Sequence, residues 1–301
     1  MLTVLIKTFA FLLMICMGFG FKKCGVLHAD DSRVLIKIVV NITMPAALIS
    51  GFREFHFDSS LLFAIALGFG FNLVLMAAGY LFSVGREGSI RALYLLGVPT
   101  YNIGSFVLPF VQGFLPGSAV LTLSMFDIGN NPIGAGMAYS AATSVSGQGG
   151  RLSLRDIASK LFHSPPFLAY LVMMLLYAPG VRLPAEFFDL VDLFGKGNAF
   201  LAMFILGLIF ELHLGELKTV LRILGVRYAL CIAAAAAVFL LTPFDLVVRQ
   251  TLVLCLLGPI TTLSIPFALQ CGCKQSMTGA LSSMSMLCSL VLIIGALVIW
   301  A

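Results

Sequence analysis

The chain has 301 residues, of which 60% are hydrophobic and only 10% charged, and its mean hydropathy is +1.07. Soluble domains carry about 25% charged residues, so this composition excludes a water-soluble globular protein and predicts an integral membrane protein. The apolar stretches approach the ~20 residues of a transmembrane helix, which excludes an outer-membrane barrel built from ~10-residue alternating strands. The net charge of +5 is modest and no basic run is present, so nucleic acid is not an expected partner.

The seven cysteines lie mainly inside apolar stretches and lack the spacing of a zinc site. We therefore expect free thiols, no metal and no cofactor apart from a coupling ion. The first apolar run, at residues 2–21, is too long for the core of a signal peptide, and Lys22 and Lys23 follow it instead of preceding it. This pattern predicts a retained first membrane span.

Polar clusters divide the chain into ten candidate membrane spans, which predicts an all-α fold. The spans cover residues 2–21, 34–51, 60–83, 91–113, 118–143, 161–179, 187–212, 219–242, 249–270 and 276–300. The connections between them are short. Among these connections, residues 144–160 are Gly/Ser-rich and charged enough to resemble a linker, and they separate spans five and six.

Basic residues predict the orientation, because Lys and Arg in short loops stay in the cytoplasm. Thirteen of the 18 Lys and Arg residues fall at one set of alternating connections, and Arg227 is counted among them. The remaining five are Lys7, Arg53, Arg182, Lys196 and Arg249. This bias places the linker in the cytoplasm and both termini outside.

Five spans on each side of the linker predict an inverted repeat, because an odd-numbered unit copied in tandem inserts upside down. Residues 1–143 form the first unit, residues 144–160 the linker and residues 161–301 the second unit. Span four reads GVPTYNIGSFVLPF from residue 97, and span nine reads GPITTLSIPF from residue 258. Both segments open with Gly and Pro and close with Pro-Phe.

Spans two and seven share a weaker match. Pro45 follows Asn41 by four residues in span two, and Ala202 follows Asn198 by four residues in span seven. Asn41, Pro45 and Asn198 are therefore weak site candidates.

Paired prolines in spans four and nine predict helix breaks. Proline removes a backbone donor and clashes with the preceding turn, and freed backbone groups are tolerated at membrane depth only where they are buried or line a wet cavity. The breaks are candidate walls of a binding site, and the N-terminal end of a half-helix favours an anion. Alternatively, the prolines only kink these helices. The candidate substrate-binding residues are Pro99, Thr100, Asn102, Ser105 and Pro109 in span four, and Pro259, Thr261, Thr262, Ser264 and Pro266 in span nine.

Asp127 stands out as an ionisable residue inside a predicted span. A carboxylate within a membrane span indicates a functional site by default, and Asn130 and Asn131 follow within about one helical turn. The three residues form a candidate site for a coupling ion, either H+ or Na+. Alternatively, span five begins later and Asp127 lies in a loop or helix cap near the external surface.

No motif indicates an enzyme. The sequence has no H-E-x-x-H or G-x-S-x-G within a span and no Walker A or Gly-rich nucleotide fingerprint. Transport driven by ATP would need a separate subunit.

Several segments resemble the auxin efflux carrier family, whose bacterial members are related to plant PIN auxin transporters within the bile-acid and arsenite transporter superfamily. The likeness covers essentially the whole chain. The matching residues are Asn41, Pro45 and Ala46 in span two, Asn102, Gly104 and Pro109 in span four, Leu201–Leu208 in span seven, and Pro259 with Ile265–Phe267 in span nine. Gly104 joins the candidate site through this match.

The resemblance implies a scaffold of spans one, two, six and seven, and a mobile transport domain of spans three to five and eight to ten. Spans four and nine would cross at an anion site. It further implies elevator-like alternating access, a small mono- or dicarboxylate such as malate or malonate as substrate, and a location in the bacterial inner membrane, with a homodimer as the candidate assembly. The alternatives are a sodium-coupled symporter of the bile-acid type and a non-transporting membrane sensor or channel component.

Overall fold

The computed structural model describes residues 2–53, 58–148, 150, 153–177, 179–210 and 217–301, and these residues form helices and connections with no strand. Three of the short elements, η2, η3 and η4, are π-helical turns. The elements are α1 (Leu2–Lys23), η1 (Ala29–Asp31), α2 (Ser32–Ile38), η2 (Val39–Thr43), α3 (Met44–Ser50), α4 (Ser59–Ser83), α5 (Gly88–Gly97), η3 (Ile103–Val107), α6 (Leu108–Phe114), α7 (Ala119–Pro132), η4 (Ile133–Met137), α8 (Ala138–Ser146), α9 (Leu154–Phe162), α10 (Pro165–Tyr177), α11 (Ala185–Gly195), α12 (Gly197–Ile209), α13 (Leu217–Leu241), α14 (Leu246–Leu256), α15 (Ser264–Gln270) and α16 (Gln275–Ile299).

Six helical stretches in the described residues are long and apolar enough to cross a membrane, which indicates a multi-pass all-α membrane protein. They are Leu2–Lys23, Ser32–Ser50, Ser59–Ser83, Ala185–Ile209, Leu217–Leu241 and Gln275–Ile299. Shorter apolar helices cover Ile103–Phe114, Pro165–Tyr177 and Leu246–Leu256. Ten spans and their inverted repeat stay predictions.

The segment predicted as a linker, residues 144–160, is partly helical. Helix α8 continues to Ser146, and α9 begins at Leu154, while residues 149 and 151–152 lie outside the described part of the chain. A capping box starts α9, since the Ser153 hydroxyl accepts from the Asp156 N–H and the Asp156 carboxylate accepts from the Ser153 N–H. These bonds from Ser153 lower the pKa of the Asp156 carboxyl.

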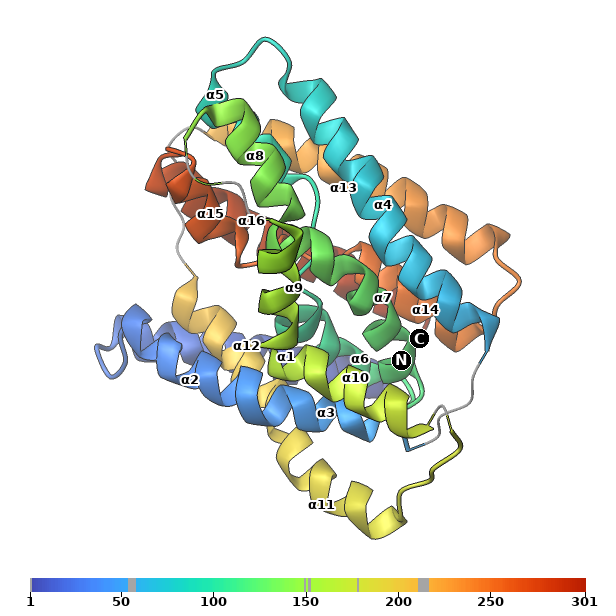
Figure 1. Ribbon diagram of the computed structural model, residues 1–301. Helices are drawn as coiled ribbons and strands as arrows, with labels where there is room; N and C mark the ends of the chain where they lie inside the picture. Colours follow the sequence, from blue (N-terminus) through green and yellow to red (C-terminus); the bar gives the residue numbers. More distant parts are fainter. Residues whose placement is uncertain (1, 54–57, 149, 151–152, 178, 211–216) are drawn as a thin grey trace.

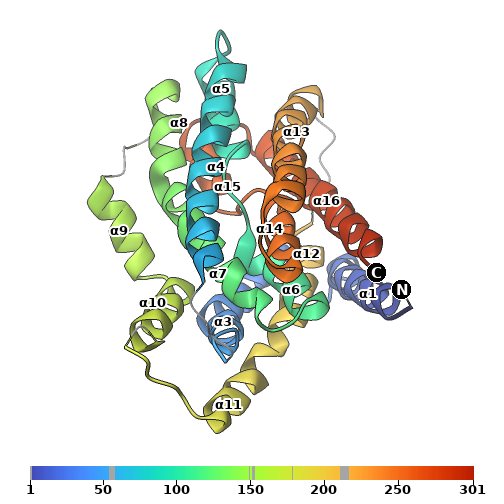
Figure 2. The same cartoon turned by 90° about the vertical axis from the view of Figure 1, so that its right-hand side faces the viewer.

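The helices form two groups that pack mainly within themselves (Figure 1, Figure 2). In the first group, α1 packs along α12, and α3 packs against α10 and α11. In the second group, α4 packs along α7, α5 along α8, and α14 against both α7 and α13. Helix α6 contacts α12 of the first group and α7 of the second. The two chain termini lie side by side in both views.

The close contact between α4 and α7 depends on two glycines. A side chain at Gly68 would overlap the backbone carbonyl of Phe126, and one at Gly129 would overlap the carbonyl of Ile65. Small residues allow membrane helices to approach backbone to backbone. Since Asn72 lies one turn after Gly68 and Asn130 directly follows Gly129, this contact brings the two asparagines together in the interior.

Candidate functional site

Two helices are interrupted in the interior. Helix α5 ends at Gly97 and the next helical turn begins at Ile103, and α14 ends at Leu256 before α15 begins at Ser264. Pro99 and Pro259 lie in these interruptions, which we call the first break (98–102) and the second break (257–263).

The second proline of each predicted pair does not open its helix. Pro109 is buried inside the continuous helix Ile103–Phe114, directly after its π-helical turn, while Pro266 lies in the first turn of α15 and is exposed. The expectation that the break extends to the second proline of each pair was therefore wrong. Pro266 is tolerated because the N–H of a first helical turn has no helical partner, and Pro109 follows a π-helical turn, where the regular hydrogen-bond pattern is already changed.

The two breaks contact each other directly. The Asn102 N–H donates to the Pro259 carbonyl at 2.8 Å, although the residues are far apart in the sequence. A side chain at Gly258 would collide with the Val107 methyl group, so glycine permits this approach. The two breaks therefore meet in the interior at Asn102 and Pro259, and we call this contact the crossing.

Two asparagines hold the backbone of the first break. Asn72 Oδ1 accepts from the Thr100 N–H at 2.6 Å, and Asn130 Oδ1 accepts from the Tyr101 N–H at 3.0 Å. Asn130 Nδ2 donates to the Tyr101 carbonyl at 3.0 Å, and Asn72 Nδ2 donates to Asn130 Oδ1 at 3.1 Å. The freed backbone groups are thus paired, as groups at membrane depth must be. Asn72 was missed in the sequence because it is one isolated polar residue in an apolar helix.

Asp127 lies inside α7 and is only 8% exposed, so the alternative of a surface loop or cap is wrong. Its carboxylate accepts from Asn130 Nδ2 at 3.0 Å and from the Tyr170 hydroxyl at 3.4 Å. Through Asn130 it is linked to the backbone of the first break. Asn131 is half-buried on the same helix.

Arg227 of α13 connects both breaks. Its Nη1 donates to the carbonyls of Val98 at 2.6 Å and Pro99 at 3.2 Å, and its Nη2 donates to the Gly258 carbonyl at 2.9 Å. The side chain is 0% exposed, and the guanidinium lies 4.6 Å from the Tyr101 ring centroid. Counting Arg227 as a cation of the cytoplasmic face was therefore wrong. Its helix starts with Lys218 and Arg222, so no sequence pattern indicates that the third cation turns inward.

The second break has fewer partners. The Ile260 N–H donates to Ser285 Oγ at 2.9 Å, and Ser264 Oγ donates to the Thr261 carbonyl at 2.7 Å within the local turn. Thr261 is half-buried and Thr262 is exposed. This break thus presents more of its surface than the first.

A small cavity of about 50 Å³ lies where the breaks meet α2 and α12. Asn102 is 7% exposed, and its Nδ2 has no hydrogen-bond partner in the protein. An unpaired buried donor is costly, so this amide is suited to a ligand acceptor. The lining residues are Ile36, Val39, Asn102, Ser105, Ala202, Ile205, Leu206, Ile209 and Thr262.

The cavity at Asn102 neighbours a larger one, of about 440 Å³, because Ile209 lines both. The larger cavity lies between α12, α15 and α16, and Gln275, Ser276, Ser282 and Ser283 contribute polar groups to it. The larger cavity therefore lies next to the cavity at Asn102, on the side of the connection between α15 and α16.

A layer of packed side chains closes the opposite side. Asn198 Nδ2 donates to Gln112 Oε1 at 3.2 Å, and Asn198 Oδ1 accepts from the Thr43 hydroxyl at 3.3 Å. The Met44 thioether packs on Gly104, where a side chain would overlap the sulfur. Asn198 thus belongs to this closing layer.

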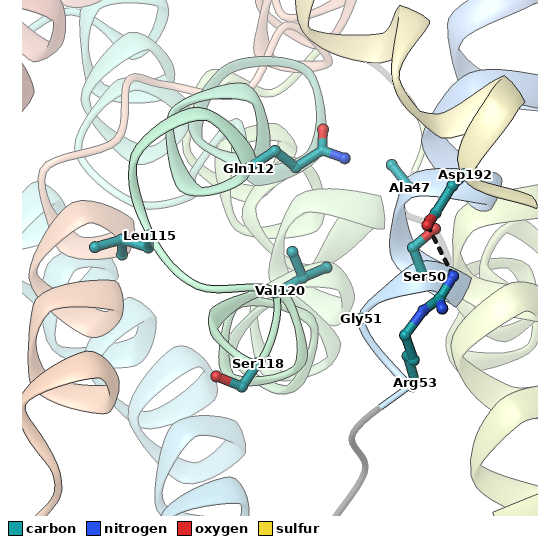
Figure 3. A pocket seen from close by; sticks show the side chains of 10 residues that line it. Ala47, Ser50, Gly51, Arg53, Gln112, Leu115, Ser118, Val120 and Asp192 are labelled. Atoms are coloured by element: carbon teal, nitrogen blue, oxygen red, sulfur yellow. Dashed lines mark hydrogen bonds and ion pairs between the residues drawn. The ribbon is translucent and has the colours of Figure 1, made fainter. Parts of the chain in front are cut away.

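A cavity of about 230 Å³ lies beyond that layer, with Gln112 and Asp192 on facing walls (Figure 3). Arg53 Nη2 donates to Asp189 at 2.8 Å and to Asp192 at 2.9 Å. The hydrogen bond to Asp189 raises the pKa of the Arg53 guanidinium. This cavity joins α3 and α11 of the first helix group to α6 and α7.

The weak candidates of span two lie outside the site. Asn41 is exposed, and its Nδ2 donates to the Lys37 carbonyl of its own helix at 2.7 Å. Pro45 is half-buried inside the continuous helix Ser32–Ser50, just after its π-helical turn. Neither residue lines the cavity at Asn102.

Thr100 is strained. It has a φ of +71°, and it is the one residue other than glycine with a positive φ in the described chain. A β-branched residue in this conformation is an outlier, costing about 1–2 kcal/mol. Its hydroxyl is also buried without a partner. Strain of this kind gathers at functional sites.

The described residues contain no group of three or more His, Cys, Asp or Glu side chains that could hold a metal ion. The described cysteines are all free. No family model matches the chain, and no curated protein matches it either. A function for this chain must therefore be inferred from the geometry of its side chains.

Proposed function

We propose that this protein is a secondary transporter for a small organic anion and works by alternating access. The observation that carries the proposal is the Asn102 amide, a buried donor without a partner at the crossing of two interrupted helices. Interrupted helices that meet inside a membrane protein are the usual way in which carriers build a substrate site.

The donors at the crossing favour an anion. The helix Ile103–Phe114 directs its N-terminal end, with partial positive charge, to the position of Asn102. Among the described residues that line the cavity, none is acidic. A carboxylate accepting from Asn102 Nδ2 would make a charge-assisted hydrogen bond, which is stronger than a neutral one.

The cavities support alternating access. Asn102 neighbours the larger cavity near Gln275, whereas the layer around Asn198 separates it from the cavity near Arg53. With the predicted topology, this conformation opens toward the cytoplasm and is closed toward the outside. The first helix group would act as the scaffold and the second as the moving domain, in ten spans arranged as two inverted repeats.

Asp127 is the proposed coupling group, for H+ or Na+. Its carboxylate is buried and linked through Asn130 to the backbone of the first break, so a change in its charge would act on that backbone. A Na+ requirement for uptake would favour a symporter of the bile-acid type. Transport unaffected by pH, Na+ and Asp127→Asn would remove Asp127 from the mechanism.

Membership of the auxin efflux carrier family is part of the proposal. It is supported by the crossing of the breaks at Pro99 and Pro259 and by the place of Asn102 at that crossing. The family precedent makes mono- and dicarboxylates the first substrates to test, and a homodimer in the bacterial inner membrane the first assembly to look for.

The experiment is a thermal-stability screen of the detergent-solubilised protein against acetate, malonate, malate and succinate. A ligand at a hundredfold excess over its Kd stabilises the folded state by about 2.7 kcal/mol. We expect at least one carboxylate to stabilise the wild type, and Asn102→Ala to abolish the effect. Asn41→Ala, which removes an exposed amide outside the cavity, serves as the matched control and should respond as the wild type does. An Asn102→Ala protein with the wild-type response would reject the site.

A further inference from the structure

We infer that Arg227 sets the charge selectivity of the crossing, so that the site takes anions in preference to neutral molecules of the same shape. The inference rests on the proposed function and adds to it the residue that selects the substrate class. Arg227 is a positioning residue, because it contacts the backbone of both breaks and does not line the cavity at Asn102.

The guanidinium faces the negative ends of two helices. Helices α5 and α14 both end at the crossing, and the carbonyls that accept from Arg227 are those of Val98, Pro99 and Gly258, just past these ends. The C-terminal end of a helix carries about half a negative charge. Two such ends would make the crossing repel an anion, and one full positive charge offsets both.

The charge of Arg227 has no acidic partner. Among the described residues, no carboxylate forms an ion pair with it, and its Nε has no hydrogen-bond partner. With the two C-terminal ends offset, the N-terminal end of the helix Ile103–Phe114 and the Asn102 amide present partial positive charge to the cavity.

A neutral side chain could make part of these hydrogen bonds. A glutamine amide could donate to two of the three carbonyls without the cost of burying a charge, which is large where no acidic group compensates it. A positive charge held in the interior at this cost indicates that the charge itself has a use. We infer that Arg227 attracts an anion to the interior of the protein, where a cation on the surface is too distant to act.

The test compares malonate with malonamide, its neutral analogue of similar shape, by equilibrium binding to the purified protein in detergent. We expect the wild type to prefer malonate, and Arg227→Gln to reduce the ratio of the two affinities about tenfold, the effect of one charge at ~10 Å at an effective dielectric constant near 20. Arg227→Lys keeps the charge and should keep the preference, even if both ligands bind more weakly.

A second pair of variants covers the case in which Arg227→Gln does not fold. Cys231 lies one turn after Arg227 on α13 and is buried. Cys231→Asp would place a compensating carboxylate beside the guanidinium, and Cys231→Asn is its neutral control. We expect the aspartate variant to lose the preference for malonate and the asparagine variant to keep it.

The outcomes separate the two proposals. Equal loss of affinity for malonate and malonamide in Arg227→Gln would show a purely structural role and overturn the inference while leaving the proposed function in place. An unchanged preference in both Arg227→Gln and Cys231→Asp would overturn it as well. A wild-type protein that binds no carboxylate of the series in the thermal-stability screen would reject the proposed function, and this inference with it.

Discussion

The two breaks have similar sequences and different surroundings. In the first break the N–H groups of Thr100, Tyr101 and Asn102 are all bonded, and two of them donate to asparagine side chains of α4 and α7. In the second break Ser285 supplies the side-chain acceptor for Ile260 N–H. A Gly/Pro signature therefore predicts an interruption but not how firmly it is held. The first break is held by more hydrogen bonds, and the second is more exposed.

The largest change in stability is expected at the α4–α7 contact, which places Asn72 beside the first break. Gly68→Ala would push α4 away from the Phe126 carbonyl and pull Asn72 away from the first break, so we expect it to destabilise the protein by about 3 kcal/mol. Gly70→Ala is the matched control on the same helix, since a side chain there meets no atom within 4 Å. Thermal unfolding in detergent measures both. Equal stability of the two variants would contradict the close-packed contact.

Removing one hydrogen-bonding side chain from each break tests directly whether the first break is held more firmly than the second. Asn130→Ala leaves the buried N–H and C=O of Tyr101 without partners, so we expect a loss of about 2–3 kcal/mol. Ser285→Ala leaves one N–H of the second break unpaired and should cost about 1 kcal/mol. Urea or thermal unfolding of both variants gives the comparison. A larger loss in Ser285→Ala would reverse our ranking of the two breaks.

The smallest effect concerns the strain at Thr100. Thr100→Gly removes both the unfavourable positive φ and an unpaired hydroxyl, and we expect a gain of up to about 1 kcal/mol in stability. Thr261→Gly in the second break, where φ is not positive, should destabilise instead. Should both variants lose stability equally, the strain at Thr100 would be absent in solution.

The helices and the two interruptions can be predicted from patterns in the sequence. Apolar stretches of helix length predict the helices, and Pro99 and Pro259 with neighbouring glycines predict the two interruptions. Pro109 and Pro266 mislead because a proline within the helix that follows a break has the same sequence signature as one that breaks a helix. The partners of the first break could not be predicted, because Asn72 looks like a lone polar residue in α4. Arg227 looks like the last of three cations at the start of α13, and only packing shows that it turns inward.

The central claim is that the crossing at Asn102 carries a small organic anion through the membrane. Counterflow of radiolabelled malonate or malate in proteoliposomes tests it most directly, because counterflow needs a saturable carrier and is not produced by a sensor or an open channel. We expect counterflow with the wild type and with Asn41→Ala, and none with Asn102→Ala. Counterflow by Asn102→Ala at the wild-type rate, or none by the wild type with any small carboxylate, would contradict the claim.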